Sequence, residues 1–575
     1  MKSININFYN NSLNKKQRFQ VIIGILVNIF TIFVELFSIT ALIPLIIVIL
    51  KGDLSNIDLG FLNNFKNNFE NYLVIENLQI IVLFTFFLFL FKSLFFLFIN
   101  YYNAWLQGNI TTIVSNKIYY KYLKKNFSIS NSKSSSELIN DCTSVAEDFV
   151  KNSFIATILA FKSFLTLLFI LIFLFIIYTK IIITISSALF VIYLIYYLLA
   201  KKFLIKLGKK KLKLSQILIK LLKETSSALK EIKLYTLENK FIDDHFLKKF
   251  QLERVKRLEK ITTNLPKSFS EIIILLFIFI LILFQKIEQN SVNLALTISV
   301  LGYSALRIIP QVIFIVRYYN KLNYVSFVAE KVINIINDKS DIKSTYENIE
   351  NIDLKKEIRL KNINFKYNDT NKEIFNDLNF SIKKGEIIGI VGESGVGKTT
   401  LINIISGLIS NFEGKIIIDD KEINFHTCNW QNKIALIPQE VMYFDASVLE
   451  NITLNLSNQI DKIFFDRILE KSQTKNFINQ LPEGVDTNIG EDGRTLSAGQ
   501  RQRLGIARAL YRDPELMIFD EATSSLDDEN ENRIIETIKD FKGKKTIIII
   551  SHKKKPLEIC DIIYKIENKK INVLN

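Results

Sequence analysis

The sequence predicts a chain of two parts: an all-α domain that crosses a membrane six times, followed by an α/β nucleotide-binding domain. Two observations predict this fold class. Long apolar runs, each near or beyond the roughly 20 residues that span a bilayer, fill the N-terminal part. A glycine-rich phosphate loop stands between a predicted strand and a predicted helix in the C-terminal part. With 575 residues, 49% of them hydrophobic, the chain is also too long for one domain.

Six apolar segments are long enough to cross a bilayer. They cover residues 19–50, 78–104, 154–178, 181–200, 263–285 and 292–318. No small-residue cleavage site follows the first segment, so we expect it to be retained as an anchor. The three cysteines have no close spacing, which excludes a disulfide framework and a CxxC metal site.

Charge is distributed unevenly between the predicted loops. Residues 201–262 contain 18 Lys or Arg and 7 Asp or Glu, whereas residues 51–77 contain two Lys and four Asp or Glu. Because positive charge stays on the cytoplasmic side, the N-terminus, both long loops (105–150 and 201–262) and the C-terminal domain are predicted to be cytoplasmic. The same clustering accounts for the net charge of +16. It favours contact with anionic lipid headgroups, and no aromatic-interleaved basic motif indicates nucleic-acid binding.

A complete GxxxxGK[ST] loop follows the apolar run Ile387–Val391, which is typical of a buried parallel strand. Its glycines allow successive backbone N–H groups to surround a phosphate, and the next helix directs its positive end at the same anion. We expect Lys398 to reach the β- and γ-phosphates of ATP and Thr399 to ligate Mg²⁺. The predicted ATP-binding residues of this loop are Gly392, Glu393, Ser394, Gly395, Val396, Gly397, Lys398, Thr399 and Thr400.

A second buried strand is predicted at Leu516–Glu521, and it ends in two carboxylates. Asp520 is expected to hold Mg²⁺, and Glu521 to polarise the attacking water. Upstream, the run Leu496-Ser497-Ala498-Gly499-Gln500 opens a predicted helix whose N-terminus suits a phosphate.

Together with Gln439, Asp527 and Ser551-His552, these motifs resemble, in the same order, the ATPase domain of ABC transporters. The resemblance implies that Tyr367 stacks on adenine, that Gln439 contacts Mg²⁺ and that His552 senses the γ-phosphate. The catalytic residues it implies are Glu521, His552, Gln439 and Lys398, and the Mg²⁺ ligands are Thr399, Gln439 and Asp520.

The resemblance also implies a homodimer. In that family the signature of one subunit covers ATP on the other, so Ser497, Gly499, Gln500 and Asp527 would bind the partner's nucleotide. Two departures are present: the signature reads LSAGQ, with Ala498, and the switch reads SHK. Neither removes a catalytic atom, so hydrolysis is expected at both sites.

The exporter branch of this family is indicated by Thr487–Gly493, which resembles the exporters' loop ahead of the signature. The resemblance implies a six-helix transmembrane domain at residues 1–330, a linker at 331–355 and a nucleotide-binding domain at 356–575. Bends near 105–150 and 201–262 would rest on the ATPase domains as coupling helices. The location it implies is the inner, or cytoplasmic, membrane of a bacterium. A soluble ABC protein acting on ribosomes or DNA would lack the six spans.

Ionisable residues inside the predicted spans give information about the cargo. Placing a charged side chain in hydrocarbon costs free energy, so such residues usually face a cavity or a partner. They are Glu35, Lys92, Lys162, Lys267, Glu271 and Arg307. They could pair internally. As a set they favour an anion path, since a homodimer would bring two copies each of Lys92, Lys267 and Arg307 to its central cavity.

Four stretches, FVELFSITALIPLI, LFKSLFFLFINYY, NLPKSF and ALRIIPQ, resemble PglK-type lipid-linked oligosaccharide flippases of bacteria. That resemblance implies a polyprenyl-pyrophosphate glycan as cargo, with Lys92, Lys267 and Arg307 attracting its pyrophosphate. Another amphipathic cargo, such as a lipid A-like lipid, a peptide or a drug, is the alternative.

Overall fold

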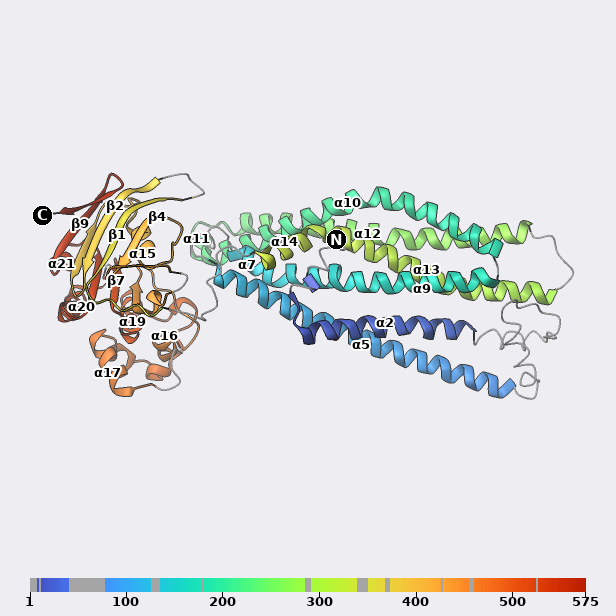
Figure 1. Ribbon diagram of the computed structural model, residues 1–575, viewed down its shortest axis with the longest axis horizontal. Helices are drawn as coiled ribbons and strands as arrows, with labels where there is room; N and C mark the ends of the chain where they lie inside the picture. Colours follow the sequence, from blue (N-terminus) through green and yellow to red (C-terminus); the bar gives the residue numbers. More distant parts are fainter. Residues whose placement is uncertain are drawn as a thin grey trace. The chain divides into compact units, whose positions relative to one another are not determined.

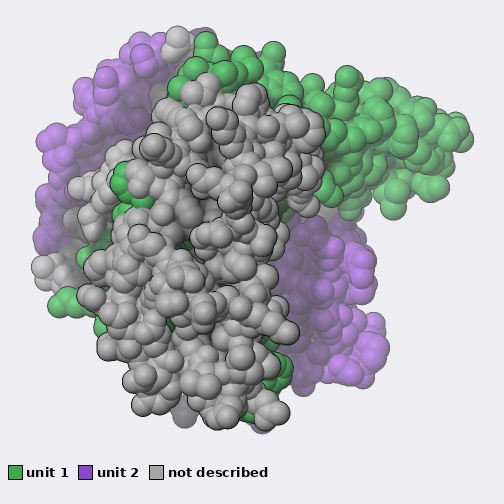
Figure 2. Space-filling model, turned by 90° about the vertical axis from the view of Figure 1, so that its right-hand side faces the viewer, with its two compact units in different colours: residues 1–123, 133–340 green, residues 124–132, 341–575 purple. Residues whose placement is uncertain are grey.

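The computed structural model describes residues 8–9, 12–40, 78–125, 135–177, 179–284, 291–338, 350–367, 373–425, 428–454, 460–523 and 526–574. The chain divides into two compact units, which Figure 2 colours separately. The helical unit comprises residues 1–123 and 133–340, and the α/β unit comprises residues 124–132 and 341–575.

Long helices build the helical unit (Figure 1). Its helices are α2 (Lys15–Thr40), α5 (Leu78–Lys124), α7 (Ser135–Asn140), α8 (Ala146–Phe149), α9 (Ile155–Ile177), α10 (Thr179–Ser227), α11 (Leu229–Leu234), α12 (Glu238–Phe284), α13 (Ser291–Tyr324) and α14 (Ser326–Asn337). Two π-helical turns, Asp141–Val145 and Val150–Phe154, flank α8. A helix therefore covers the described part of each predicted span, and residues 41–50 of the first span lie outside the described residues.

Three helices continue well past the predicted spans: α5, α10 and α12 contain 47, 49 and 47 residues. The parts beyond the spans cover much of the predicted loops 105–150 and 201–262, and the short helix α11 lies between α10 and α12. Among the described residues, three segments are long and apolar enough to cross a membrane. They are Lys15–Ser38, Val82–Lys124 and Ser135–Phe173.

Packing in the helical unit joins α9, α10, α12 and α13, and α2 lies against α9. Helix α14 adds an amphipathic element: Val328, Ala329, Val332 and Ile336 are buried at helical spacing in the same core. The predicted linker, 331–355, therefore begins inside a packed helix.

The α/β unit contains a six-stranded sheet in the order β10-β9-β3-β8-β7-β6. These strands are β3 (Ile387–Val391), β6 (Ile434–Ile437), β7 (Leu516–Asp520), β8 (Thr546–Ile550), β9 (Ile562–Glu567) and β10 (Lys570–Leu574). Its strands are parallel except for β10. A four-stranded antiparallel sheet has the order β2-β1-β4-β5. Its strands are β1 (Glu357–Lys366), β2 (Glu373–Lys383), β4 (Glu413–Ile418) and β5 (Lys421–Glu422).

Both faces of the parallel sheet are covered, which is why its central strands β3, β7 and β8 are apolar at most positions. Along β8, Ile548 and Ile550 belong to one hydrophobic cluster, and Ile547 and Ile549 belong to the other. Helix α15 (Lys398–Ile405) contributes to the first cluster, whereas α19 (Ala498–Tyr511) and α20 (Asp528–Asp540) contribute to the second. The remaining helices are α16 (Val448–Thr453), α17 (Lys462–Lys471), α18 (Lys475–Ile478) and α21 (Lys554–Leu557).

Candidate functional site

Four neighbouring parallel strands end at one edge of the sheet, and each is followed by a predicted site residue. The phosphate loop follows β3, His552 follows β8, Glu521 follows β7 and Gln439 follows β6. Ligands of open parallel sheets bind at the carboxyl ends of the strands. The topology therefore places these groups together, although they are far apart in sequence.

The phosphate loop has the backbone geometry that its glycines permit. Gly395 and Gly397 adopt φ values of +79° and +117°, which side chains rarely allow. A Cβ on Gly397 would also lie 2.7 Å from Cγ2 of Ile374, so the space beside the loop is closed as well. Helix α15 begins directly after this turn, at Lys398. Its N-terminal N–H groups are therefore available to an anion at the loop.

Lys398 lies folded over its own loop. Its Nζ donates to the carbonyl oxygens of Gly392 and Glu393, at 2.6 and 3.2 Å, and lies 3.1 Å from Nε2 of His552. Loop carbonyls therefore hold the ammonium beside the turn in which phosphate is expected. Phosphate oxygens would be stronger partners for a cation than these neutral carbonyls.

Glu521 is held between two other site residues. Its Oε1 lies 3.3 Å from Nε2 of His552, and its Oε2 accepts from Nε2 of Gln439 at 3.1 Å. Its backbone N–H donates to the carbonyl of Ile550 at 3.0 Å, and its φ of +50° is strained for a residue with a side chain. Strained backbone that is over-determined by its surroundings is frequent at functional sites.

Asp520 ends strand β7 beside Glu521. The pKa of Asp520 is raised above its ordinary value because burial disfavours the charged carboxylate and because Glu521 adds a like charge, while Lys398 acts in the opposite direction. A cation bound next to the two carboxylates would relieve this repulsion.

The donor set fits Mg²⁺. Thr399, Gln439 and Asp520 offer hydroxyl, amide and carboxylate oxygens, the ligand type that this ion prefers. Within the described residues, no group of three or more His, Cys, Asp or Glu could hold a metal ion. Mg²⁺ at a nucleotide site is usually bound by one or two protein carboxylates, substrate phosphates and water.

Tyr367 follows strand β1, and Thr400 lies in the first turn of α15. The Tyr367 hydroxyl lies 3.1 Å from Oγ1 of Thr400, and the residue is 37% exposed. The ring packs edge-on against Phe365. Tyr367 is therefore anchored next to the phosphate loop with part of its ring accessible, as an adenine platform requires.

Ser497 of the signature and Asp527 each cap the start of a helix. Ser497 and Gln500 form a capping box at the start of α19, with the Gln500 N–H donating to Oγ of Ser497 at 3.2 Å. Asp527 caps α20 by accepting from Asn530. In the described part of the chain, no hydrogen bond or ion pair of Ser497, Gln500 or Asp527 reaches the phosphate loop.

Lys92, one of the three residues predicted to bind cargo, lies inside the helical unit. It is 6% exposed, its Nζ donates to Oγ of Ser38 at 2.6 Å, and the rings of Phe89 and Phe96 flank it. Lys267 and Arg307 lie on helices α12 and α13. Their side chains fall outside the described residues, so their position in a cavity stays a prediction.

The sequence did not predict two further polar contacts in the helical unit, besides that of Lys92. Nε2 of Gln311 on α13 lies 3.4 Å from Oε2 of Glu35 on α2, and both side chains are buried. Lys162 on α9 lies over the Phe96 ring, 5.2 Å from its centroid. Buried polar groups from α2, α5 and α13, and the half-buried Lys162 of α9, thus occur within otherwise apolar spans.

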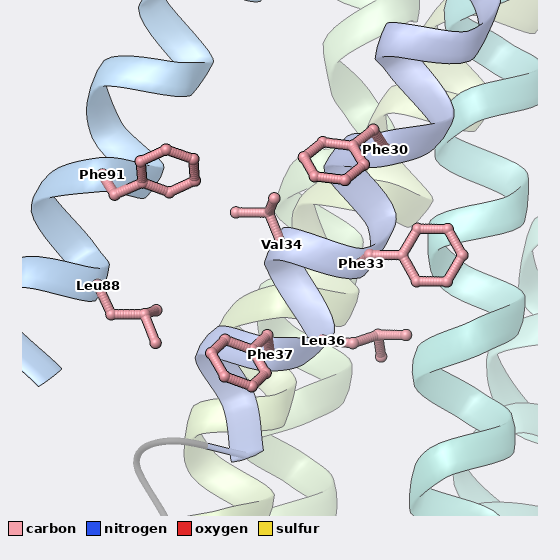
Figure 3. A pocket seen from close by; sticks show the side chains of 7 residues that line it. All are labelled: Phe30, Phe33, Val34, Leu36, Phe37, Leu88 and Phe91. Carbon is pink, nitrogen blue, oxygen red and sulfur yellow. The ribbon is translucent and has the colours of Figure 1, made fainter. Parts of the chain in front are cut away.

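An apolar groove of about 560 Å³ separates α2 from α5. Figure 3 shows Phe30, Val34 and Phe37 of α2 pointing toward Leu88 and Phe91 of α5. The lining is apolar throughout and lies within two of the candidate spans. In a bilayer such a surface contacts hydrocarbon and not water.

Comparison with known proteins agrees with this geometry. Residues 375–524 match the ABC transporter family. Over 98% of its length, the chain superimposes on 95% of a solved chain titled "Structure of a bacterial Atm1-family ABC exporter with ATP bound", with a TM-score of 0.79 and 17% sequence identity. The chain has the fold of an ABC exporter. The predicted fold class is confirmed, and the stretch that matches the ABC transporter family lies in the α/β unit.

Curated relatives match over shorter stretches. The ATP-dependent lipid A-core flippase of Pseudomonas aeruginosa is 37% identical over 37% of this chain and 36% of its own length. That of Coxiella burnetii is 31% identical over 60% of this chain and 59% of its own. The alpha-hemolysin translocation ATP-binding protein HlyB of Escherichia coli is 33% identical over 46% of this chain and 37% of its own. The chain therefore spans between 36% and 59% of these relatives.

Proposed function

We propose that this protein is an ATP-driven exporter that moves an anionic, amphipathic lipid across the inner membrane of a bacterium. The observation that carries the proposal is the meeting of the phosphate loop, Glu521, Gln439 and His552 at one sheet edge, in a chain whose other unit consists of long apolar helices. ATP hydrolysis and transport are then coupled within one polypeptide.

The hydrolysis step follows from the roles of the chain's own groups. The loop N–H groups and Lys398 bind the phosphates, and Glu521 orients and polarises the attacking water. His552 and Gln439 hold the Glu521 carboxylate in place through the contacts described above. Mg²⁺, held by Thr399, Gln439 and Asp520, would neutralise phosphate charge. Tyr367 would stack on adenine.

We propose that the working form is a homodimer. The signature residues Ser497, Gly499 and Gln500, together with Asp527, would close the ATP site of the second copy. The position of Ser497 and Asp527 at exposed helix starts supports this assignment. Two identical chains would then form two ATP sites, and ATP binding would favour one transporter state over the other by differential affinity.

Three features support an anionic lipid as cargo. Lys92 is a buried cation within a predicted span, the groove between α2 and α5 is apolar, and two relatives are lipid A-core flippases. Within this class we propose a polyprenyl-pyrophosphate glycan, with Lys92, Lys267 and Arg307 binding its pyrophosphate. A lipid A-like lipid is the second candidate, because of those two relatives.

Stimulation of ATPase activity in lipid nanodiscs tests the cargo. We expect a polyprenyl-pyrophosphate glycan to stimulate the wild-type chain, because a cargo that binds one transporter state better shifts the cycle toward it. A lipid A-like lipid is tested in parallel, and a hydrophobic peptide serves as the control. Stimulation by the peptide alone would contradict the lipid proposal, and stimulation by lipid A alone would assign the second candidate.

Neutralising the three predicted cargo-binding cations tests the anion path. The triple variant Lys92→Gln, Lys267→Gln, Arg307→Gln is expected to lower lipid flipping by about tenfold or more, because a hydrogen bond to a charged group contributes about 1.5–3 kcal/mol. Basal ATPase activity should persist, since these residues lie in the helical unit.

The matched control replaces Lys210, Lys240 and Arg254 by Gln, which removes the same charge from the predicted cytoplasmic helices. Flipping is measured in proteoliposomes by the accessibility of a labelled lipid headgroup. Equal flipping by the cargo-site variant and the control would show that the three intramembrane cations have a structural role only.

A further inference from the structure

Lys553, the residue after His552, connects three parts of the ATPase domain. Its Nζ donates to the carbonyl oxygen of Thr523 at 3.2 Å and to Oε1 of Glu531 at 3.0 Å. Its backbone N–H donates to Oγ of Ser551 at 3.0 Å. One side chain thus joins the loop that carries His552, the segment that follows Glu521 and the first turn of α20.

Glu531 gives this contact its rigidity. Its side chain is 3% exposed, so its carboxylate has left water and needs a partner of opposite charge. Lys553, with a side chain 42% exposed, supplies that charge from the rim. A buried carboxylate fixes the ammonium more firmly than a surface pair would, because a surface pair exchanges readily with water.

The same turn of α20 is tied to the signature helix. Asn530 donates from Nδ2 to Oδ1 of Asp527 at 2.7 Å and accepts from Nη1 of Arg503 on α19 at 3.2 Å. Nη1 of Arg503 also donates to the carbonyl of Gln473 at 2.8 Å, which anchors it to the α17–α18 turn. These contacts hold the first turn of α20 against the signature helix α19. Lys553 connects the loop that carries His552 to this turn.

We infer that Lys553 is a positioning residue for ATP hydrolysis: by holding Thr523 and Glu531 together, it keeps His552 and Glu521 at their mutual distance of 3.3 Å. The inference rests on the proposed hydrolysis and adds a residue to it. Lys553 need not touch nucleotide for this role. Its loss would displace two groups that act on the γ-phosphate and the attacking water, while the phosphate loop would stay intact.

The test is steady-state ATPase kinetics of the full chain in nanodiscs. Lys553→Met is expected to lower kcat by about 10- to 100-fold, the cost of misplacing groups at a reacting centre. KM for ATP should stay within about twofold, because phosphate binding is untouched. Lys553→Arg keeps the charge and reach and should restore kcat to within about threefold of wild type. Lys554→Met removes an exposed neighbouring lysine and should leave kcat unchanged.

A second variant separates positioning from folding. Lys553→Met with Glu531→Gln removes the unpaired buried carboxylate and should recover thermal stability while kcat stays low. Recovery of kcat in this double variant, or wild-type kcat in Lys553→Met, would overturn the inference. A wild-type chain without ATPase activity would instead overturn the proposed function, so the two failures are distinguishable.

Discussion

Replacing Glu521 with Gln is expected to reduce ATP turnover by about 100- to 1000-fold, the typical loss when one group that stabilises the transition state is removed. The amide preserves the size of the side chain and can still meet Gln439 and His552, which lie 3.1 and 3.3 Å from the carboxylate oxygens. The substitution removes the negative charge that we propose polarises the attacking water.

ATP binding by Glu521→Gln should stay within about twofold of wild type, since the change acts on turnover and not on ground-state binding. Turnover is measured as phosphate release, and binding as fluorescence of an ATP analogue. Glu483→Gln, the same change at an exposed carboxylate before the signature, is the control and should leave both quantities unchanged. Near-normal turnover in Glu521→Gln would mean that another group activates the water.

The sequence predicted the phosphate loop in detail because strand, turn and helix are encoded locally there. The glycines of the loop, Gly395 and Gly397, have the positive φ values that only glycine adopts easily. Gln439 and His552 were assigned only through the family resemblance. Their contacts with Glu521 depend on the order of β6, β7 and β8 in the sheet, which local sequence does not specify.

In the helical unit, the sequence does not predict which helices contact each other. The spans are apolar on nearly every side, so their sequences do not reveal which face of a helix meets which neighbour. The contact of Lys92 with Ser38 joins residues 54 positions apart, and that of Gln311 with Glu35 joins residues 276 apart. The sequence could indicate that these polar residues need partners, but only the packing of α2, α5 and α13 identifies them.

In the α/β unit, the contact of Lys553 with Glu531 likewise could not be predicted from the sequence. Lys553 follows Ser551-His552, and its partner Glu531 lies on α20, a helix rich in charged residues. The burial of Glu531 follows from how α20 packs against the sheet, and that packing turns an ordinary surface lysine into a connection between loops.

Gly208→Ala is expected to destabilise the helical unit by about 2 kcal/mol. Helices α10 and α13 approach so closely there that a Cβ on Gly208 would overlap the carbonyl oxygen of Tyr324 and lie 2.8 Å from its carbonyl carbon. Overpacking of this kind costs about 3 kcal/mol at its upper end, because backbone must move. The gain in helix propensity on replacing Gly with Ala returns only about 1 kcal/mol.

Gly108→Ala is the matched control, because it adds the same methyl group to a helix at a position without close neighbours among the described residues. Gly108 lies in α5, and a methyl group added there would meet no atom of another described side chain or helix within 4 Å, so only helix propensity changes. It should stabilise the protein by up to about 1 kcal/mol. Thermal unfolding in detergent measures both variants, with Tm expected to fall for Gly208→Ala and to hold or rise for Gly108→Ala. Equal Tm shifts would show that α10 and α13 are not in backbone contact at this point, because the two substitutions differ only in what surrounds the added methyl group.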